Sequence, residues 1–123
     1  SGPGGYVCAI RMAQLGFKTA IIEKYSALGG TCLNVGCIPS KALLDSSERY
    51  HQAVHGNEVH GIDTSGAKLD ITKMMKRVQD VVSTTSGGVK YLMDKNKITT
   101  FYGHGSFKDK NTILVKSDKE TIE

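Results

Sequence analysis

A glycine-rich turn that leads into an amphipathic helix and then a short apolar strand constrains this chain's fold most strongly. The turn at Gly2–Gly5 is followed by apolar residues at a helical period over residues 6–15, and the helix stops at Gly16. The run Lys18–Glu23 contains β-branched residues and ends on an acid, which is typical of a buried parallel strand. We therefore predict an α/β fold that begins with a βαβ unit whose first strand is missing.

Two further helices are expected after this unit. Pro39 begins a helix that runs through Val54, and a polar, glycine-containing loop follows over residues 55–68. Asp70 or Thr72 can cap the next helix, whose apolar residues follow the i, i+3, i+4, i+7 stripe of a core-facing helix. That stripe comprises Ile71, Met74, Met75, Val78, Val81 and Val82.

The C-terminal third of the chain combines the end of that helix with strand-like segments. Gly87-Gly88 interrupts the apolar stripe and Val89–Met93 resumes it, so we predict one long helix with a weak point. The segments after it predict a small β-meander. Its expected strands are at Phe107 and Thr112–Lys116, whereas Lys97–Tyr102 is simply strand-like, and Ser117–Glu123 is typical of a turn that enters another strand.

Composition excludes several classes of protein. With 123 residues, 39% of them hydrophobic and 23% charged, the chain has the size and composition of one globular domain. No run approaches the ~20 apolar residues of a membrane span. The net charge is +4, but the lysines are scattered, which indicates a solvated basic face and not a nucleic-acid groove. Three cysteines are too few for a disulfide scaffold, so a reducing compartment fits best.

The glycine turn partly matches the dinucleotide fingerprint G-x-G-x-x-G. Gly2 and Gly5 correspond to its second and third glycines. Gly2 lets the backbone approach a pyrophosphate, and Gly5 lets the helix pack closely on its strand. Glu23 ends the next strand, where a carboxylate can accept hydrogen bonds from ribose hydroxyls and repel a 2′-phosphate. The alternative is a flexible glycine-rich terminus followed by an ordinary amphipathic helix.

Cys32 and Cys37 form a C-x4-C pair. On a regular helix their α-carbons would be at least ~7.5 Å apart, too far for a disulfide, so the segment must bend if the pair oxidises, and Gly36 allows a bend. Pro39 suits the first helical position, which places Cys37 just before a helix N-terminus that favours the thiolate. Lys41 adds a cation nearby.

The residues leave three interpretations of the pair open: a redox-active disulfide, which the pattern favours, a structural disulfide, and a metal site. Zinc sites need four ligands, and no second cysteine pair exists. The spacing of His51, His55 and His60 matches no common metal motif, so we assign no metal site. Cys8 falls on the apolar face of the first helix, and we expect a buried, inert thiol there.

The segment GGTCLNVGCIPSKALL at Gly29–Leu44, with the Gly2–Gly5 turn and Glu23, closely resembles the flavin-dependent pyridine nucleotide-disulfide oxidoreductases. Within this family it is most similar to the members that oxidise dihydrolipoamide. Glutathione and mercuric reductases are near relatives, and those of the glutathione type tend to have a second lysine where this chain has Ser40. The resemblance implies that residues 1–123 are a partial Rossmann-like FAD-binding domain with a small β-meander.

The resemblance also implies site roles. Cys32 would be the interchange thiol that reacts with dihydrolipoamide, and Cys37 the charge-transfer thiol against the flavin. Glu23 would bind the adenosine ribose, Lys41 would lie near the reactive flavin nitrogen, and Gly105 would meet the adenine. The full expected FAD set is Gly2, Gly4, Gly5, Glu23, Lys24, Gly30, Thr31, Cys32, Cys37, Lys41 and Gly105.

The implied reaction passes electrons from dihydrolipoamide through the cysteine pair and FAD to NAD⁺. The implied partners are the lipoyl domain of a 2-oxoacid dehydrogenase complex and a second copy of the enzyme, in a bacterial cytoplasm or a mitochondrial matrix. The NAD-binding domain, the dimerisation domain and a His-Glu base would be absent from this chain, so it would not be competent alone. Two other functions stay open: a non-catalytic nucleotide-binding redox sensor, and a small structural or metal-stabilised domain.

Overall fold

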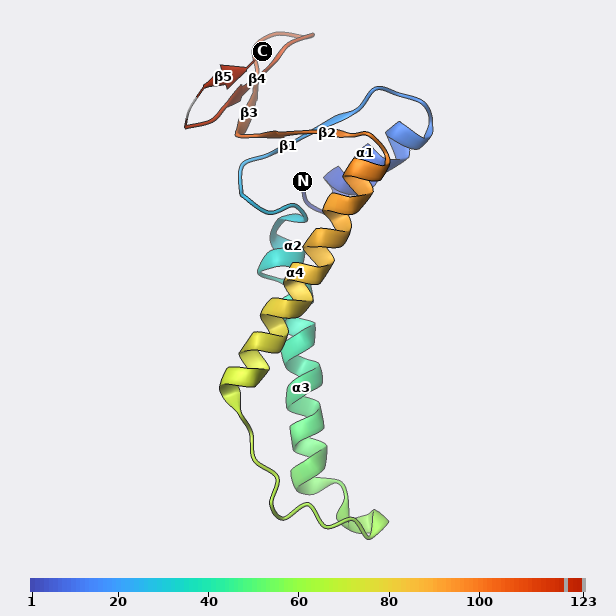
Figure 1. The fold of residues 1–123 in the computed structure, drawn as a ribbon, viewed down its shortest axis with the longest axis vertical. Helices are drawn as coiled ribbons and strands as arrows, with labels where there is room; N and C mark the ends of the chain where they lie inside the picture. Colours follow the sequence, from blue (N-terminus) through green and yellow to red (C-terminus); the bar gives the residue numbers. More distant parts are fainter. Residues whose placement is uncertain (119, 123) are drawn as a thin grey trace.

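The computed structural model describes residues 1–118 and 120–122; Lys119 and Glu123, within the expected C-terminal turn and strand, lie outside the described residues. The molecule is elongated, with the strands gathered at one end and a long helical hairpin extending from them (Figure 1). The helices are α1 (Pro3–Gln14), α2 (Gly30–Asn34), α3 (Cys37–His55), the 3-10 helix η1 (Glu58–His60) and α4 (Ile71–Lys95). The strands are β1 (Ala20–Glu23), β2 (Thr99–Tyr102), β3 (His104–Phe107), β4 (Ile113–Lys116) and β5 (Thr121–Ile122).

The strands form two sheets, a parallel pair and a separate meander. β1 pairs in parallel with β2, in a register that places Ala20 opposite Thr99 and Glu23 opposite Tyr102. β3, β4 and β5 form an antiparallel meander. Gly103 joins the two sheets with a φ of +155°, and a β-carbon there would lie 2.7 Å from the Lys116 carbonyl oxygen, so this tight corner requires glycine. The corner places the meander directly after the end of the parallel pair.

The core lies where α1, α2 and α4 meet the parallel pair. Met93 on α4 is fully buried, and it packs with Ile21 of β1 and Leu33 of α2. The other members of this cluster are Ala9, Leu28, Val89 and Ile98. Because α4 contributes to this core only near its C-terminal end, the rest of the helix is left to pair with α3.

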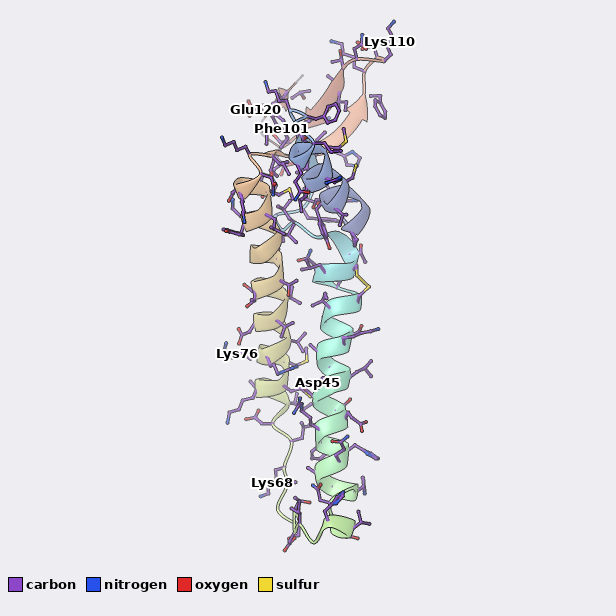
Figure 2. All side chains as sticks on the ribbon, turned by 90° about the vertical axis from the view of Figure 1, so that its right-hand side faces the viewer. Asp45, Lys68, Lys76, Phe101, Lys110 and Glu120 are labelled. Atoms are coloured by element: carbon purple, nitrogen blue, oxygen red, sulfur yellow. A yellow bond between two sulfur atoms is a disulfide. The ribbon has the colours of Figure 1, made fainter. Side chains whose placement is uncertain are left out.

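Helices α3 and α4 lie side by side as a hairpin (Figure 2). Asp70 is the N-cap of α4 and accepts a hydrogen bond from the Lys73 N–H at 3.0 Å, so Asp70, not Thr72, is the cap. Arg77 of α4 donates to Asp45 Oδ2 at 2.7 Å and to the Ala42 carbonyl oxygen at 2.9 Å on α3. These bonds fix the register of the two helices.

Helix α4 confirms the prediction of one long helix through Gly87-Gly88, but its apolar stripe is only partly buried. Val78 is buried, whereas Ile71 and Met75 are 58% and 44% exposed, so their predicted core position is wrong. They lie in the first turns of α4, where only α3 is alongside. None of the helices in residues 1–118 and 120–122 is long and apolar enough to cross a membrane.

Two predictions about the N-terminal half need correction. Cys8 is exposed, not buried, because α1 turns a different side toward the core. That side carries Ala9, Tyr6, Ile10 and Ala13. The helix predicted from Pro39 begins two residues earlier, at Cys37, so Pro39 is its third residue. Proline is tolerated there because the N–H groups of the first turn have no partner within the helix.

Candidate active site

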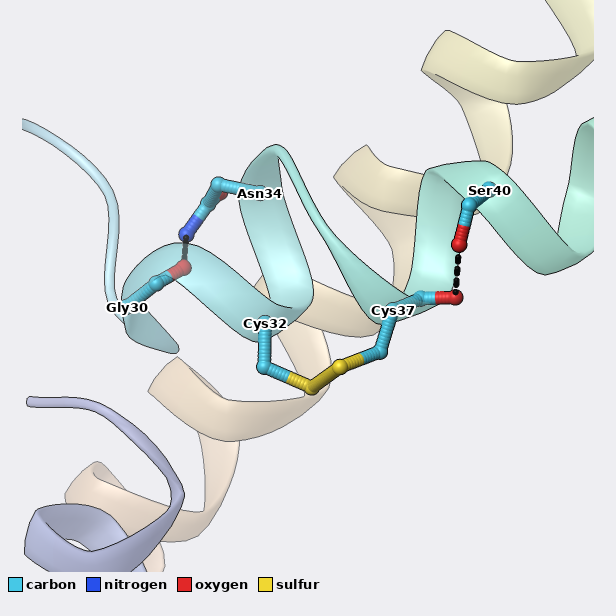
Figure 3. The surroundings of a disulfide bond; sticks show 5 residues. All are labelled: Gly30, Cys32, Asn34, Cys37 and Ser40. Carbon is cyan, nitrogen blue, oxygen red and sulfur yellow. Dashed lines mark hydrogen bonds between the residues drawn. A yellow bond between two sulfur atoms is a disulfide. The ribbon is translucent and has the colours of Figure 1, made fainter.

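The two cysteines of the C-x4-C segment lie on either side of a sharp bend. Cys32 belongs to α2, a short helix that the sequence did not predict, and Cys37 is the first residue of α3. Figure 3 shows the disulfide that joins their sulfur atoms across the bend. Their α-carbons are 4.7 Å apart, well below the spacing of a continuous helix, which confirms that the segment bends to let this pair oxidise.

Gly36 makes this bend possible. The N–H groups of Val35 and Gly36 both donate to the Thr31 carbonyl oxygen, at 3.0 and 2.8 Å, and so end α2. A β-carbon at Gly36 would lie 3.2 Å from that same oxygen, which is closer than most side chains come to a backbone atom. The absence of a side chain at Gly36 therefore brings the two cysteines together.

The start of α3 gives Cys37 a particular electrostatic environment. As the first residue of a 19-residue helix, Cys37 lies at the positive end of the helix dipole, which stabilises a thiolate. Ser40 supports this first turn: its N–H donates to the Gly36 carbonyl oxygen at 3.1 Å, and its hydroxyl donates to the Cys37 carbonyl oxygen at 3.1 Å. Lys41 is exposed one turn further along α3. The arrangement makes Cys37 the better leaving group of the pair.

The glycine turn caps α1 and touches α2. Gly2 is the N-cap of α1, and its carbonyl oxygen accepts from the Gly5 and Tyr6 N–H groups at 2.8 and 3.0 Å. Gly30 has a φ of +66°, and a β-carbon there would lie only 2.5 Å from the Gly2 α-carbon. The turn and the cysteine-bearing helix are thus in direct backbone contact.

The other glycines of the turn are less constrained by their surroundings. A β-carbon at Gly5 would lie 3.9 Å from Ile21 Cδ1, an ordinary contact, so packing of α1 on β1 does not itself require glycine as the fingerprint suggested. Gly4 is exposed, and within the described residues no heavy atom outside its own helix and chain neighbours lies within 4 Å of a β-carbon built there.

Glu23 at the end of β1 is the only buried charged side chain among the residues that the structure describes. It accepts hydrogen bonds from the Ser1 amino group and the Tyr25 N–H, both at 2.9 Å, and from the Ser1 hydroxyl. Burial acts to raise the pKa of Glu23, but these hydrogen bonds and the charge of the amino group outweigh it and lower the pKa to about 2. Glu23 is therefore a fixed, ionised acceptor.

Two pockets adjoin this carboxylate and the cysteine helix. One, of about 360 Å³, brings together Glu23, Lys24 and Gly105, three predicted site residues that are far apart in sequence, and its other lining residues are Ser1, Ile22, Gly103 and His104. The second, of about 390 Å³, includes Gly30 and Thr31. The structure thus brings Glu23, Lys24 and Gly105 together in one pocket and Gly30 and Thr31 in the other, and Gly2 contacts Gly30, whereas Gly4, Gly5 and Lys41 line neither pocket.

Sequence reasoning missed several polar residues that organise this region. Ser1 bonds Glu23 and also the Gly29 N–H, and Asn34 donates to the Leu28 and Gly30 carbonyl oxygens at 3.1 and 3.0 Å. Ser86, far along the chain on α4, donates to the same Leu28 oxygen at 3.1 Å. Asn34 lies inside the C-x4-C segment, so its position in the sequence could have suggested a structural role. No sequence pattern marks Ser86.

Among the described residues, the histidines form no metal site with Glu23 or with the cysteine pair. His51 and His55 contact each other near the end of α3, with ring centroids 5.0 Å apart. Within residues 1–118 and 120–122, no group of three His, Cys, Asp or Glu side chains could hold a metal ion. His104 lines the pocket beside Glu23.

Comparisons with known proteins agree with this geometry. The family model described as pyridine nucleotide-disulphide oxidoreductase matches residues 1–123. Relatives include mitochondrial dihydrolipoyl dehydrogenases from Schizosaccharomyces pombe (54% identical over 94% of this chain), Pisum sativum (52% over 99%) and Homo sapiens (51% over 98%). The chain spans 22% to 24% of the length of these relatives.

A solved structure has the same fold. The flavoprotein disulfide reductase RclA from Escherichia coli, solved as a Cu(II) complex, superposes with a TM-score of 0.78 at 22% identity, over 98% of this chain and 24% of that one. This likeness confirms a partial, Rossmann-like α/β domain with a meander. The match of the family model over residues 1–123 shows that the chain belongs to the pyridine nucleotide-disulphide oxidoreductase family.

Proposed function

We propose that this chain is the N-terminal, FAD-binding part of a dihydrolipoyl dehydrogenase, in which Cys32 and Cys37 are the catalytic residues. The observation that carries the proposal is the Cys32–Cys37 disulfide, held across a bend with one sulfur at the start of a long helix. A purely structural disulfide would not need a sulfur at a helix N-terminus, whereas a reversible disulfide uses that position to stabilise the released thiolate. The relatives named as dihydrolipoyl dehydrogenases support lipoamide as the substrate.

The exchange follows from the different positions of the two sulfurs. A thiolate of dihydrolipoamide attacks Cys32 Sγ, the Cys32–Cys37 bond breaks, and its electron pair leaves on Cys37 as a thiolate. The second thiol, after losing its proton to a base, attacks the substrate sulfur of the mixed disulfide. This step closes the lipoamide ring and releases Cys32 as a thiolate. Two electrons have then moved from the substrate to the cysteine pair.

The residues around the glycine turn fit a flavin dinucleotide. Gly2 and Gly4 would approach the pyrophosphate at the N-terminus of α1, where helix N–H groups favour anions. The backbone contact between Gly2 and Gly30, which leaves no room for a side chain at Gly30, would hold this turn against the start of α2. Glu23 lies in one pocket with Lys24 and Gly105, and its carboxylate would accept hydrogen bonds from ribose hydroxyls.

The redox side of the cradle would be formed by Gly30, Thr31 and the cysteine pair, with Lys41 on α3. FAD held there would supply a two-electron acceptor for the Cys37 thiolate and a link for those electrons to NAD⁺. We assign the NAD site, the proton-accepting base and the homodimer contacts to other parts of the whole enzyme. We therefore propose that residues 1–123 are not competent alone. The whole enzyme would act on a lipoyl domain, in a mitochondrial matrix or bacterial cytoplasm.

The test uses the full-length protein purified with its flavin. We expect a yellow protein that forms NADH from NAD⁺ and dihydrolipoamide, and negligible turnover of glutathione disulfide or Hg(II) with NADPH. Cys32→Ser and Cys37→Ser should each abolish NADH formation, whereas the control Cys8→Ser should retain it because Cys8 is exposed on α1. A colourless protein, or activity that survives Cys32→Ser, would overturn the proposal. A preference for glutathione disulfide or Hg(II) would show that the protein is a related reductase with a different substrate.

A further inference from the structure

The peptide that joins Leu28 to Gly29 is held at both ends by groups from three different parts of the chain. Its carbonyl oxygen accepts from Asn34 Nδ2 and from Ser86 Oγ, each at 3.1 Å. Its N–H, on Gly29, donates to the Ser1 carbonyl oxygen at 3.2 Å and to the Ser1 hydroxyl at 3.3 Å. Leu28 is only 3% exposed, so leaving its carbonyl oxygen without a partner would be costly.

The two residues that follow need this support because of their backbone conformations. Gly29 and Gly30 have φ values of +106° and +66°, which turn the chain from the end of the β1 loop into α2. Glycine populates many other conformations, so two successive glycines do not fix the direction of α2 by themselves. The direction of α2 decides where Cys32, two residues after Gly30, places its sulfur relative to Cys37.

We propose that Ser86 and Asn34 are positioning residues for thiol–disulfide exchange, acting through the Leu28 carbonyl oxygen to hold α2 and hence Cys32. Asn34 ties that oxygen to the C-terminal end of α2 itself, and it also holds the Gly30 carbonyl oxygen at 3.0 Å (Figure 3). Ser86 ties the same oxygen to α4, whose neighbouring residues Val89 and Met93 are buried in the core. The rigid core thereby fixes the reactive helix.

This inference deepens the proposed function, since it assumes that the Cys32–Cys37 disulfide is exchanged with an incoming thiol. The substrate-independent probe is dithiothreitol, which reduces an accessible disulfide whatever the natural substrate is. The experiment uses the full-length flavin-loaded protein and measures two quantities: the second-order rate of reduction by dithiothreitol, and the midpoint potential of the cysteine pair. Thermal unfolding and flavin content serve as readouts of overall structure.

The variants are Ser86→Ala, the conservative Ser86→Thr, and Asn34→Ala. Ser83→Ala is the matched control, because Ser83 is an exposed serine one turn earlier on α4. Removing one of two donors should slow reduction roughly two- to fivefold, within the effect of a single hydrogen bond. Ser86→Thr should restore the rate, and Ser83→Ala should leave it unchanged. The double variant Ser86→Ala with Asn34→Ala should slow reduction by more than the product of the single effects, because the oxygen then loses both donors.

Two results would overturn the positioning role. The first is a rate and potential in Ser86→Ala equal to those of the parent protein. The second is a loss of thermal stability or flavin in Ser86→Ala with an unchanged rate per intact site, which would make Ser86 merely structural. If dihydrolipoamide fails as a substrate while the dithiothreitol effects follow the expected pattern, the proposed substrate is wrong and the positioning role stands.

Discussion

Gly30 meets Gly2 backbone to backbone: a β-carbon on Gly30 would lie 2.5 Å from the Gly2 α-carbon and 3.1 Å from its nitrogen. This contact brings the start of the cysteine-bearing helix against the N-cap of α1. The glycine turn and the cysteine-bearing helix, which are far apart in sequence, are thus in direct contact. The closeness explains the glycine at position 30, and it leads to the first prediction.

Gly30→Ala should destabilise the full-length protein and weaken flavin retention. The left-handed conformation alone costs a side chain about 1–2 kcal/mol, and the clash with Gly2 adds to this because backbone atoms cannot move aside easily. Urea unfolding and flavin content after dialysis measure the two effects. Gly66→Ala is the control, since Gly66 is exposed in the loop before α4 and should tolerate a side chain. Equal midpoints for the two variants would contradict the close contact.

Thiol labelling should separate Cys8 from the other two cysteines. Cys8 is exposed and should react with an alkylating reagent before any reduction, whereas Cys32 and Cys37 are paired. Mild reduction should then make the pair reactive, and reoxidation should restore the original pattern. Peptide mass spectrometry identifies the labelled residues. A disulfide that includes Cys8, or no new thiols after reduction, would show that the pairing is wrong.

The prediction from sequence succeeded where a local pattern determines the structure. The helix ending near Gly16, the parallel strand at Lys18–Glu23 and the meander each depend on periodicity and turn residues, and all are present. The need for a bend between Cys32 and Cys37 followed from helix geometry alone. The long helix through Gly87-Gly88 also formed, because buried residues on either side, Val78 and Val89 among them, hold it to the rest of the fold.

The failures arose where tertiary contacts decide. Helix α2 is only five residues long and is fixed by the Asn34 side chain, so no periodic pattern in the sequence predicted it. Cys8 and Met75 have the apolar character of core residues, but the elements beside them leave their faces exposed. Ser86 could not be found because its partner, the Leu28 carbonyl oxygen, is 58 residues away in sequence. Only the folded chain brings such groups together.

Glu23→Ala should weaken FAD binding in the full-length protein without preventing the Cys32–Cys37 disulfide. Loss of a charge-assisted hydrogen bond to a ribose hydroxyl should cost about 1.5–3 kcal/mol, or roughly 10- to 150-fold in affinity. Flavin titration of the apoprotein gives the affinity, and thiol counting reports the disulfide. Glu58→Ala serves as the control because Glu58 is exposed in η1, at the far end of the hairpin. An unchanged affinity would show that Glu23 is not the ribose ligand.

Gly88→Ala should stabilise the protein. Gly88 is exposed inside α4, and within the described residues no heavy atom outside its own helix and chain neighbours lies within 4 Å of a β-carbon placed there. Alanine in a helix interior is favoured over glycine by about 0.5–1 kcal/mol. Urea denaturation should show a higher midpoint with an unchanged slope. A lower midpoint would indicate that another part of the full-length protein packs against Gly88.

The pH dependence of stability should report the ionised state of Glu23 in residues 1–123. Its pKa is lowered in the folded chain to about 2 from the usual 4.5, so the folded state favours the carboxylate. The resulting stabilisation, at most about 3 kcal/mol, is fully present above pH 4.5 and is lost as the pH falls through about 2. Glu23→Gln removes the ionisable group, so its stability should fall less steeply over this range. Chemical denaturation at a series of pH values measures both curves, with Glu58→Gln as the exposed control. Parallel curves for Glu23→Gln and the parent chain would mean that the bonds from Ser1 and Tyr25 do not hold Glu23 ionised.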